Sequence, residues 1–215
     1  MQQGGSSVFA CWTVKGGSGG TVFASALALA LAQRHGKACI VDFGGDVPSV
    51  LGMAEPANRG VRDWLAAPSR EPDDFFGLYV QATNTLSVVP AGNAAAFDED
   101  ALHDLIGTVE PHTVLDFGTL QPPESIRQSI NADWLVIRPC YLALRRAARL
   151  RVRPKGVVVV RESGRSLTSR DIESVVGAPV VGHISVSDGV ARSVDAGLLA
   201  TRLPKQLAEE LEALL

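Results

Sequence analysis

A glycine-rich turn near the N-terminus has the residue types that bind phosphate. The stretch from Lys15 to Thr21 reads KGGSGGT and lies between an apolar run expected to be a strand and an apolar run expected to be a helix. In such a turn, successive backbone N–H groups and the N-terminus of the helix converge on one anion. Binding of a phosphate group is therefore the first chemistry that the sequence suggests.

The turn lacks the side chain that usually neutralises bound phosphates. In the pattern GxxxxGK[ST] the lysine reaches the β- and γ-phosphates, and the hydroxyl ligates magnesium. The four fixed positions of this pattern are taken here, in order, by Val14, Gly19, Gly20 and Thr21. Without the lysine, the turn could equally be a strand-to-helix connection that binds nothing, with the threonine as a helix cap.

Short apolar runs alternate with longer helical patterns along the 215 residues. Most runs are apolar at consecutive positions, which is typical of strands covered on both faces by helices in a parallel sheet. The runs begin at Ser7, Ala38, Leu86, Thr113, Trp134, Gly156 and Pro179. The helical patterns cover 21–35, 60–67, 98–109, 123–131, 142–152, 168–176, 188–196 and 203–215. We predict a single domain spanning 1–215, with a three-layer α/β/α fold and a mostly parallel sheet.

Two aspartates stand at the ends of predicted strands. Asp42 closes the run ACIVDF and Asp116 the run TVLDFG. The carboxyl ends of strands are where open α/β sheets bind ligands, which favours a shared site. The alternative is that each carboxylate only caps the turn that follows its strand.

These features together resemble the ParA/MinD family of ATPases, whose loop reads KGGxGK[ST] with an extra lysine near its start. Residues 15–21 match that loop at every position except the second lysine. The runs around Asp42 and Asp116 resemble the family's second strand and its Walker B strand. The segments 133–147 and 177–197 resemble two later parts of the family sequence. The resemblance is collinear over essentially the whole chain and implies a P-loop NTPase fold.

The resemblance implies a site for ATP and magnesium. Lys15 would be a catalytic residue that reaches across a dimer interface to the partner's nucleotide. Asp42 would be a second catalytic residue. The phosphates would lie against Gly16, Gly17, Ser18, Gly19, Gly20 and Thr21, and magnesium would be held by Thr21, Asp42 and Asp116.

Two contributors to catalysis are missing from this site. The loop lysine is absent, and the DxD pattern that usually ends the family's second strand reads Asp42-Phe43-Gly44, although Asp46 is a possible substitute. Phosphoryl transfer depends mainly on positioning and on stabilisation of the transferred charge. We therefore expect weak or lost binding of ATP and magnesium, with slow or absent hydrolysis.

The expected function is that of a ParA/MinD-like positioning or scaffold protein with a degenerate nucleotide site. The resemblance implies that it acts as a homodimer that recruits a protein partner, as family members of the TadZ/CpaE type would. One alternative is an active ATPase for DNA partitioning or for division-site or pilus positioning, in which Lys15 or a cation such as Arg138 compensates. Another is a nucleotide-free structural dimer.

Two segments bear on other partners. Arg145 to Lys155 carries six basic residues and no acidic one, a pattern that could bind nucleic-acid phosphates. We favour a solvated helix face, because the segment lacks interleaved aromatics and Leu144, Ala148 and Val152 have the spacing of a helix's inner face. The segment 203–215 combines an apolar stripe with an acidic face, which favours docking on protein over an anionic membrane. The longest apolar stretch, Val22 to Ala32, is far below the ~20 residues of a membrane span, so we expect a bacterial-type cytoplasmic protein.

Overall fold

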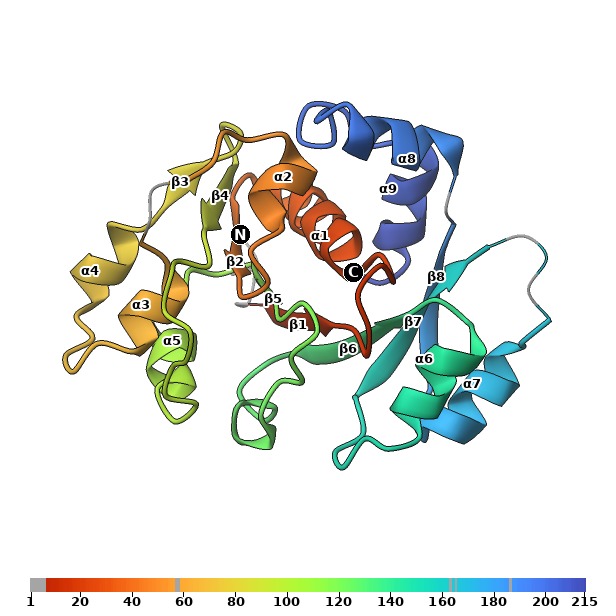
Figure 1. The fold of residues 1–215 in the computed structure, drawn as a ribbon. Helices are drawn as coiled ribbons and strands as arrows, with labels where there is room; N and C mark the ends of the chain where they lie inside the picture. The colour runs from red at the N-terminus through yellow and green to blue at the C-terminus, as the bar shows by residue number, and fades with distance from the viewer. Residues whose placement is uncertain (1–6, 57–58, 163, 165, 186) are drawn as a thin grey trace, which may run out of the picture.

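The structure is a computed structural model that describes residues 7–56, 59–162, 164, 166–185 and 187–215. An eight-stranded sheet runs through it in the order β3-β4-β2-β5-β1-β6-β7-β8 (Figure 1). The strands are β1 Val8–Trp12, β2 Ala38–Asp42, β3 Val80–Gln81, β4 Leu86–Val89, β5 Thr113–Asp116, β6 Ala132–Ile137, β7 Gly156–Arg161 and β8 Val180–Ser185. All pair in parallel except β3, which is antiparallel to β4 at one edge. The predicted, mostly parallel sheet is confirmed.

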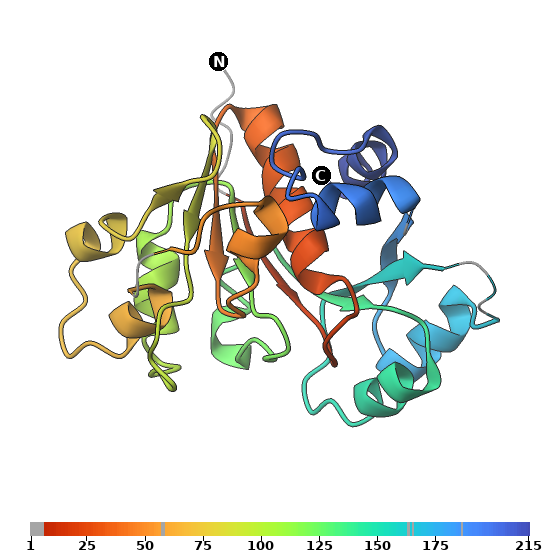
Figure 2. The ribbon, with the colours of Figure 1, turned by 45° about the horizontal axis from the view of Figure 1, so that its top comes forward.

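Helices cover both faces of this sheet. They are α1 Gly20–His35, α2 Val47–Leu51, α3 Val61–Leu65, α4 Pro72–Phe76, α5 Leu102–Thr108, α6 Tyr141–Ala147, α7 Ser169–Val176, α8 Asp188–Asp195 and α9 Lys205–Glu212. The group α1, α2, α8 and α9 lies on one face, and α3, α5, α6 and α7 lie on the other (Figures 1 and 2). The predicted three-layer α/β/α fold is confirmed.

The strands are apolar at consecutive positions because each face of the sheet packs into its own core. In β1, Ala10 and Trp12 belong to the core under α3, α5 and α6, whereas Phe9 and Cys11 belong to the core under α1. Helix α1 is apolar nearly all round, as expected of a helix buried on every side. It packs on the sheet and is also covered by α2 and α9. This packing fixes the start of α1, and with it the glycine-rich turn, against the sheet.

Three local predictions differ from the structure. The helix predicted over 123–131 is wrong, because within that range only Glu124–Ile126 forms a 3-10 turn. The helix predicted over 142–152 ends at Ala147, which leaves Ala148 exposed instead of on the inner face. Helix α4 begins at Pro72, in a part of the chain between 67 and 98 where no helix was predicted.

Candidate functional site

The glycine-rich turn connects the end of β1 to the start of α1. Its backbone is left-handed at Gly17 (φ 71°) and Gly19 (φ 84°) but not at the intervening Ser18. Such an alternation turns successive N–H groups toward one side and forms an anion nest. Apart from the adjacent residues, no heavy atom of the described chain lies within 4 Å of the position that a Cβ atom would take on Gly16 or Gly17, so the turn is open above these residues.

Hydroxyl groups hold the turn in this shape. The Oγ atoms of Thr13 and Ser18 each donate to the carbonyl of Lys15, at 3.0 Å. The backbone N–H of Thr13 donates to the carbonyl of Gly118 at 2.8 Å, which ties the turn to the end of β5. From α6, Arg146 Nη1 donates to the carbonyl of Val14 at 3.1 Å. The cradle is therefore preorganised by the protein's own contacts.

A cavity of about 410 Å³ opens over the turn. Its volume falls within the usual range of small-molecule sites. It is lined by the predicted cradle residues Gly16 to Thr21, together with Thr13, Val22, Gly44, Asp46, Ser49, Val50, Gly118 and Thr119. Among the described residues that line it, none is lysine or arginine. A cavity of about 610 Å³ between α8 and α9 is larger but lies away from the turn and from both aspartates.

Neither cation proposed to compensate for the missing lysine lines the cavity. Lys15 lies at the surface, where Nζ donates to the carbonyl of the adjacent Gly16 at 3.0 Å. Arg138 follows β6, and its Nε atom is buried without a hydrogen-bond partner among the described residues. By contrast, the possible substitute carboxylate Asp46 does line the cavity. The site thus gathers backbone donors and a carboxylate, with no fixed positive side chain.

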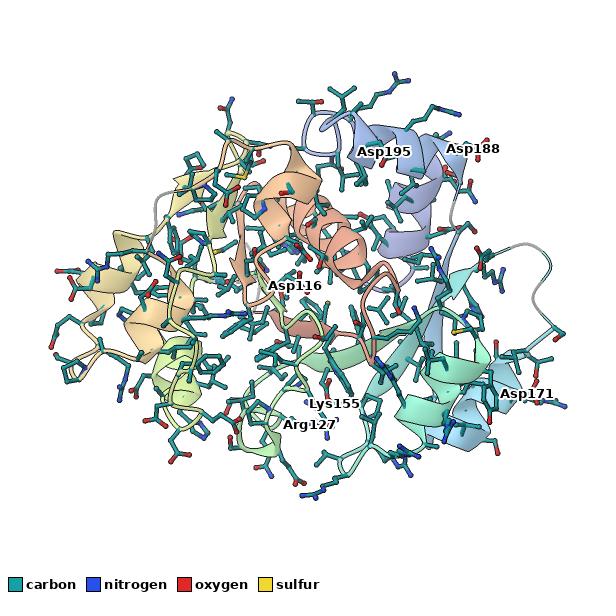
Figure 3. The ribbon with its side chains drawn as sticks, in the orientation of Figure 1. Asp116, Arg127, Lys155, Asp171, Asp188 and Asp195 are labelled. Carbon is teal, nitrogen blue, oxygen red and sulfur yellow. The ribbon has the colours of Figure 1, made fainter. Side chains whose placement is uncertain are left out.

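Asp116 is fully buried at the end of β5, near the centre of the molecule (Figure 3). Oδ1 accepts a hydrogen bond from the N–H of Gly118 at 3.1 Å, whereas Oδ2 has no partner among the described residues. Burial, reinforced by the charges of Asp42 and Asp46, raises the pKa of Asp116 to about 7, although the Gly118 N–H and the Thr21 hydroxyl lower it. A buried carboxylate oxygen without a partner is a candidate ligand for a cation.

Asp42 is the register partner of Asp116 on the neighbouring strand β2. Its Oδ1 accepts from the N–H groups of Gly44 (2.8 Å) and Gly45 (2.7 Å), and its Oδ2 accepts from Val47 at 3.0 Å. Burial raises the pKa of Asp42, and these three N–H donors lower it. Both oxygens thus hold the turn that leads into α2, which favours the capping alternative. The assignment of Asp42 as a catalytic residue or magnesium ligand stays a prediction.

The residues that remain fit magnesium as part of a larger complex. Magnesium prefers oxygen ligands and is usually bound by one or two protein groups together with water and substrate phosphates. Thr21 and the unpaired oxygen of Asp116 are such groups, and the Thr21 hydroxyl already interacts with the Asp116 carboxylate. The described part of the chain holds no group of three or more metal-binding side chains that would form a complete cage.

Solved structures of ParA/MinD ATPases share this fold over nearly the whole chain. A ParA family ATPase from Chlorobium tepidum is 22% identical, with a TM-score of 0.73 and coverage of 96% of both chains. MinD of Pyrococcus horikoshii, complexed with Mg-ADP, is 19% identical, with a TM-score of 0.71 and coverage of 97% of this chain and 93% of its own.

The MinC:MinD cell division complex of Aquifex aeolicus gives a TM-score of 0.72 at 18% identity, covering 97% of this chain and 95% of that one. No family model matches the sequence, and no curated protein matches it either. The chain therefore has the fold of the ParA/MinD P-loop ATPases, and its likeness to them lies in the structure.

Sequence reasoning missed two residues that shape the site. Thr13 and Gly118 both line the cavity and are bonded to each other, but neither belongs to the loop pattern. Both follow immediately after strands whose ends meet at the site. Their position one or two residues beyond β1 and β5 is the signal that could have identified them.

The basic segment Arg145 to Lys155 is only partly a helix face. Arg146 and Arg153 donate to the carbonyls of Val14 and Ala147, and Lys155 Nζ donates to the carbonyl of Ile130 at 2.7 Å. Figure 3 shows Lys155 beside Arg127, near the start of β7. Half of the six basic side chains thus support neighbouring backbone, in line with a structural role.

The C-terminal helix α9 packs on the body of the protein. Leu207 and Leu211 are buried in the same core as α1, and Arg34 of α1 forms an ion pair with Glu212 at 3.5 Å. This packing agrees with the expectation that the segment 203–215, with its acidic outer face, docks on protein and not on an anionic membrane. Within the described residues, no helix is long and apolar enough to cross a membrane.

Proposed function

We propose that this chain is a ParA/MinD-like positioning or scaffold protein with a degenerate nucleotide site. It binds ATP weakly, as the magnesium complex, hydrolyses it slowly or not at all, and acts by forming a homodimer that recruits a protein partner. The observation that carries the proposal is the composition of the cavity. The phosphate cradle and Thr21 line it, and no described lining residue is cationic. Asp116 does not line the cavity itself, but it lies two residues before the lining residue Gly118 and keeps a buried oxygen without a partner among the described residues.

This composition separates binding from hydrolysis. Backbone N–H groups of a preorganised nest still attract an anion, so binding survives at reduced affinity. Hydrolysis requires additional positive charge on the transferred group, and removal of one such donor commonly costs ~3 to 4 kcal/mol in the transition state. When bound, magnesium would supply part of that charge, and Thr21 and Asp116 are the residues that would hold it.

Dimer formation is proposed to use Lys15. Its ammonium group lies at the surface, where among the described residues it donates to a neighbouring carbonyl of its own turn, a weak contact that can be exchanged. A position at the rim of the cradle suits a lysine that serves the nucleotide of a second copy. Two related structures support the proposed binding of nucleotide and of a protein partner. MinD of Pyrococcus horikoshii is complexed with Mg-ADP, and MinD of Aquifex aeolicus forms a complex with MinC.

The test is equilibrium binding of labelled ATP, with magnesium and with a chelator, while light scattering follows the molar mass. We expect weak binding that requires magnesium and that increases the dimer fraction. Asp116→Asn is the matched variant, because it keeps the size of the side chain and removes the charge. Absence of binding at millimolar ATP would instead indicate a nucleotide-free structural dimer, and rapid turnover would indicate an active ATPase.

A further inference from the structure

The position of the missing lysine is closed by another side chain. A Cβ atom built on Gly20 would lie 2.3 Å from Cγ2 of Thr13 and 3.7 Å from its Cβ. The first distance is far shorter than a contact between carbon atoms, which is about 3.5 to 4.0 Å. The φ angle of Gly20 is not left-handed, so its backbone would otherwise accept any residue. The methyl group of Thr13 alone excludes a side chain at position 20.

The Thr13 methyl group is fixed in this place. Thr13 is only 4% exposed. Its Oγ1 donates to the carbonyl of Lys15 at 3.0 Å and lies 3.3 Å from the carbonyl of Gly118. Because the hydroxyl and the methyl group share one Cβ atom, rotating the methyl group away would break both contacts. The obstruction therefore cannot be relieved by a simple rotamer change.

Other glycines of the turn show that this obstruction is local. A Cβ atom on Gly16 or Gly17 would meet nothing within 4 Å, and one on Gly19 would lie 3.8 Å from Val160. Of these four glycines, only Gly20 would place a Cβ atom at clashing distance from a buried side chain. Gly20 is the position that the loop pattern gives to lysine. Thr13 and Gly20 thus form a matched pair in which the residue before the loop fills the space of the absent side chain.

We propose that Thr13 sets the ligand class of the cradle: it keeps the loop free of a fixed cation, so that the loop takes a nucleoside phosphate only together with a divalent cation. This inference rests on the proposed nucleotide site. Its steric part, the pairing of Thr13 with Gly20, is independent of any ligand. The two parts are therefore tested by different measurements.

The steric part is tested by thermal unfolding of Gly20→Ala, Thr13→Ser and the double variant. Alanine is normally preferred over glycine in a helix, so without the clash Gly20→Ala would raise Tm. With the clash we expect Tm to fall by about 3 to 8 °C, as for overpacking of a core. Thr13→Ser keeps the hydroxyl and removes the methyl group, so the double variant should recover most of this loss. An unchanged or higher Tm for Gly20→Ala in the wild-type background would overturn the inference.

The ligand part is tested by restoring the lysine. Gly20→Lys and Thr13→Ser/Gly20→Lys are compared with the wild type for binding of labelled ATP, with magnesium and with a chelator. We expect at least tenfold tighter binding only in the double variant, which should also retain ATP in the chelator. Equal gains in the single and double variants would overturn the role of Thr13. If the double variant is stable but no protein binds ATP, the steric pairing stands and the proposed nucleotide site fails.

Discussion

Asp42 and Asp116 face each other in register at the ends of β2 and β5, yet only Asp116 retains a buried oxygen without a hydrogen-bond partner among the described residues. Three N–H groups of its own turn satisfy Asp42. Two residues that look equivalent in the sequence therefore play different parts: Asp42 shapes the loop beside the cavity, and Asp116 keeps a buried acceptor two residues before Gly118 of the cavity lining. This difference leads to opposite expectations for their variants.

Asp116→Asn should remove a pH dependence of stability. The folded-state pKa of about 7 exceeds the ordinary value of 3.8, so the folded protein binds more protons than the unfolded chain between these values. The free energy of unfolding contributed by Asp116 is therefore complete below pH 3.8 and declines as the pH rises to about 7. Unfolding midpoints of the wild type and Asp116→Asn across this range should converge at low pH and diverge as the pH rises. Parallel curves would contradict the raised pKa of Asp116.

Asp42→Ala should destabilise the fold even without ligand. The change leaves the N–H groups of Gly44, Gly45 and Val47 without their acceptor, and each unpaired buried group costs about 1 to 3 kcal/mol. Because the turn is partly open to solvent, water can replace some of these bonds, and we expect a loss of about 2 to 4 kcal/mol in denaturant unfolding. The exposed Asp46→Ala is the control and should change stability by less than about 0.5 kcal/mol.

Acidification should weaken the packing at the start of β5 through a pair of histidines. The rings of His35 and His112 stack with centroids 3.7 Å apart, and Ser7 Oγ lies 2.8 Å from Nδ1 of His112. Burial and the neighbouring His35 lower the pKa of His112 below its ordinary 6.5. The folded state thus binds fewer protons than the unfolded chain below pH 6.5, so stability falls as the pH drops through that value. His35→Gln should flatten this decline in thermal unfolding; an unaltered slope would contradict the coupling.

DNA retention should be absent even at low salt. Three of the basic side chains in Arg145 to Lys155 hold backbone carbonyls, and the net charge is negative. Binding to DNA depends on several free cations that displace counterions. We expect the wild type to elute from immobilised duplex DNA without delay. Salt-sensitive retention that is abolished by changing Arg145, Arg146 and Arg149 to alanine would support the partitioning alternative.

The sequence predicted the layers and the cradle because both rest on local patterns. Consecutive apolar residues in runs such as that of β7 require burial on two faces, and this signal does not depend on distant contacts. The turn at 15–21 was placed correctly between β1 and α1 for the same reason. The short elements α2, α4 and β3 were missed because they span at most five residues, too few for a periodic pattern.

The properties of individual site residues could not be read from the sequence. Whether Asp42 or Asp116 keeps a free oxygen depends on the path of the chain after each strand. The clash between Thr13 and Gly20 depends on a rotamer held by a carbonyl 105 residues away, that of Gly118. Such contacts arise only when strand ends from distant parts of the chain meet at one edge of the sheet.

Lys15→Ala should leave the stability of the chain unchanged but prevent ATP-dependent dimerisation. Within the described part of the chain, the Lys15 ammonium donates to the carbonyl of the exposed Gly16, so its removal should change the free energy of unfolding by less than about 0.5 kcal/mol. If Lys15 serves the nucleotide of a second copy, the variant should bind magnesium-ATP almost normally but lose the ATP-dependent increase in molar mass.

Lys37→Ala is a matched control for Lys15→Ala. It removes another exposed lysine, one that forms an ion pair with Glu110 at 2.6 Å, away from the cradle at the opposite end of the sheet. The Lys37 side chain is exposed and that of Glu110 is half-buried, so loss of this ion pair should lower stability by no more than about 1 kcal/mol, and the variant should still fold and dimerise. Equal dimerisation of the two variants in ATP would show that Lys15 has no role between copies. If only Lys15→Ala loses ATP-dependent dimerisation, the lysine of one copy acts at the nucleotide of the other. Lys37→Ala also removes one positive charge, so a change in net charge alone would affect both variants.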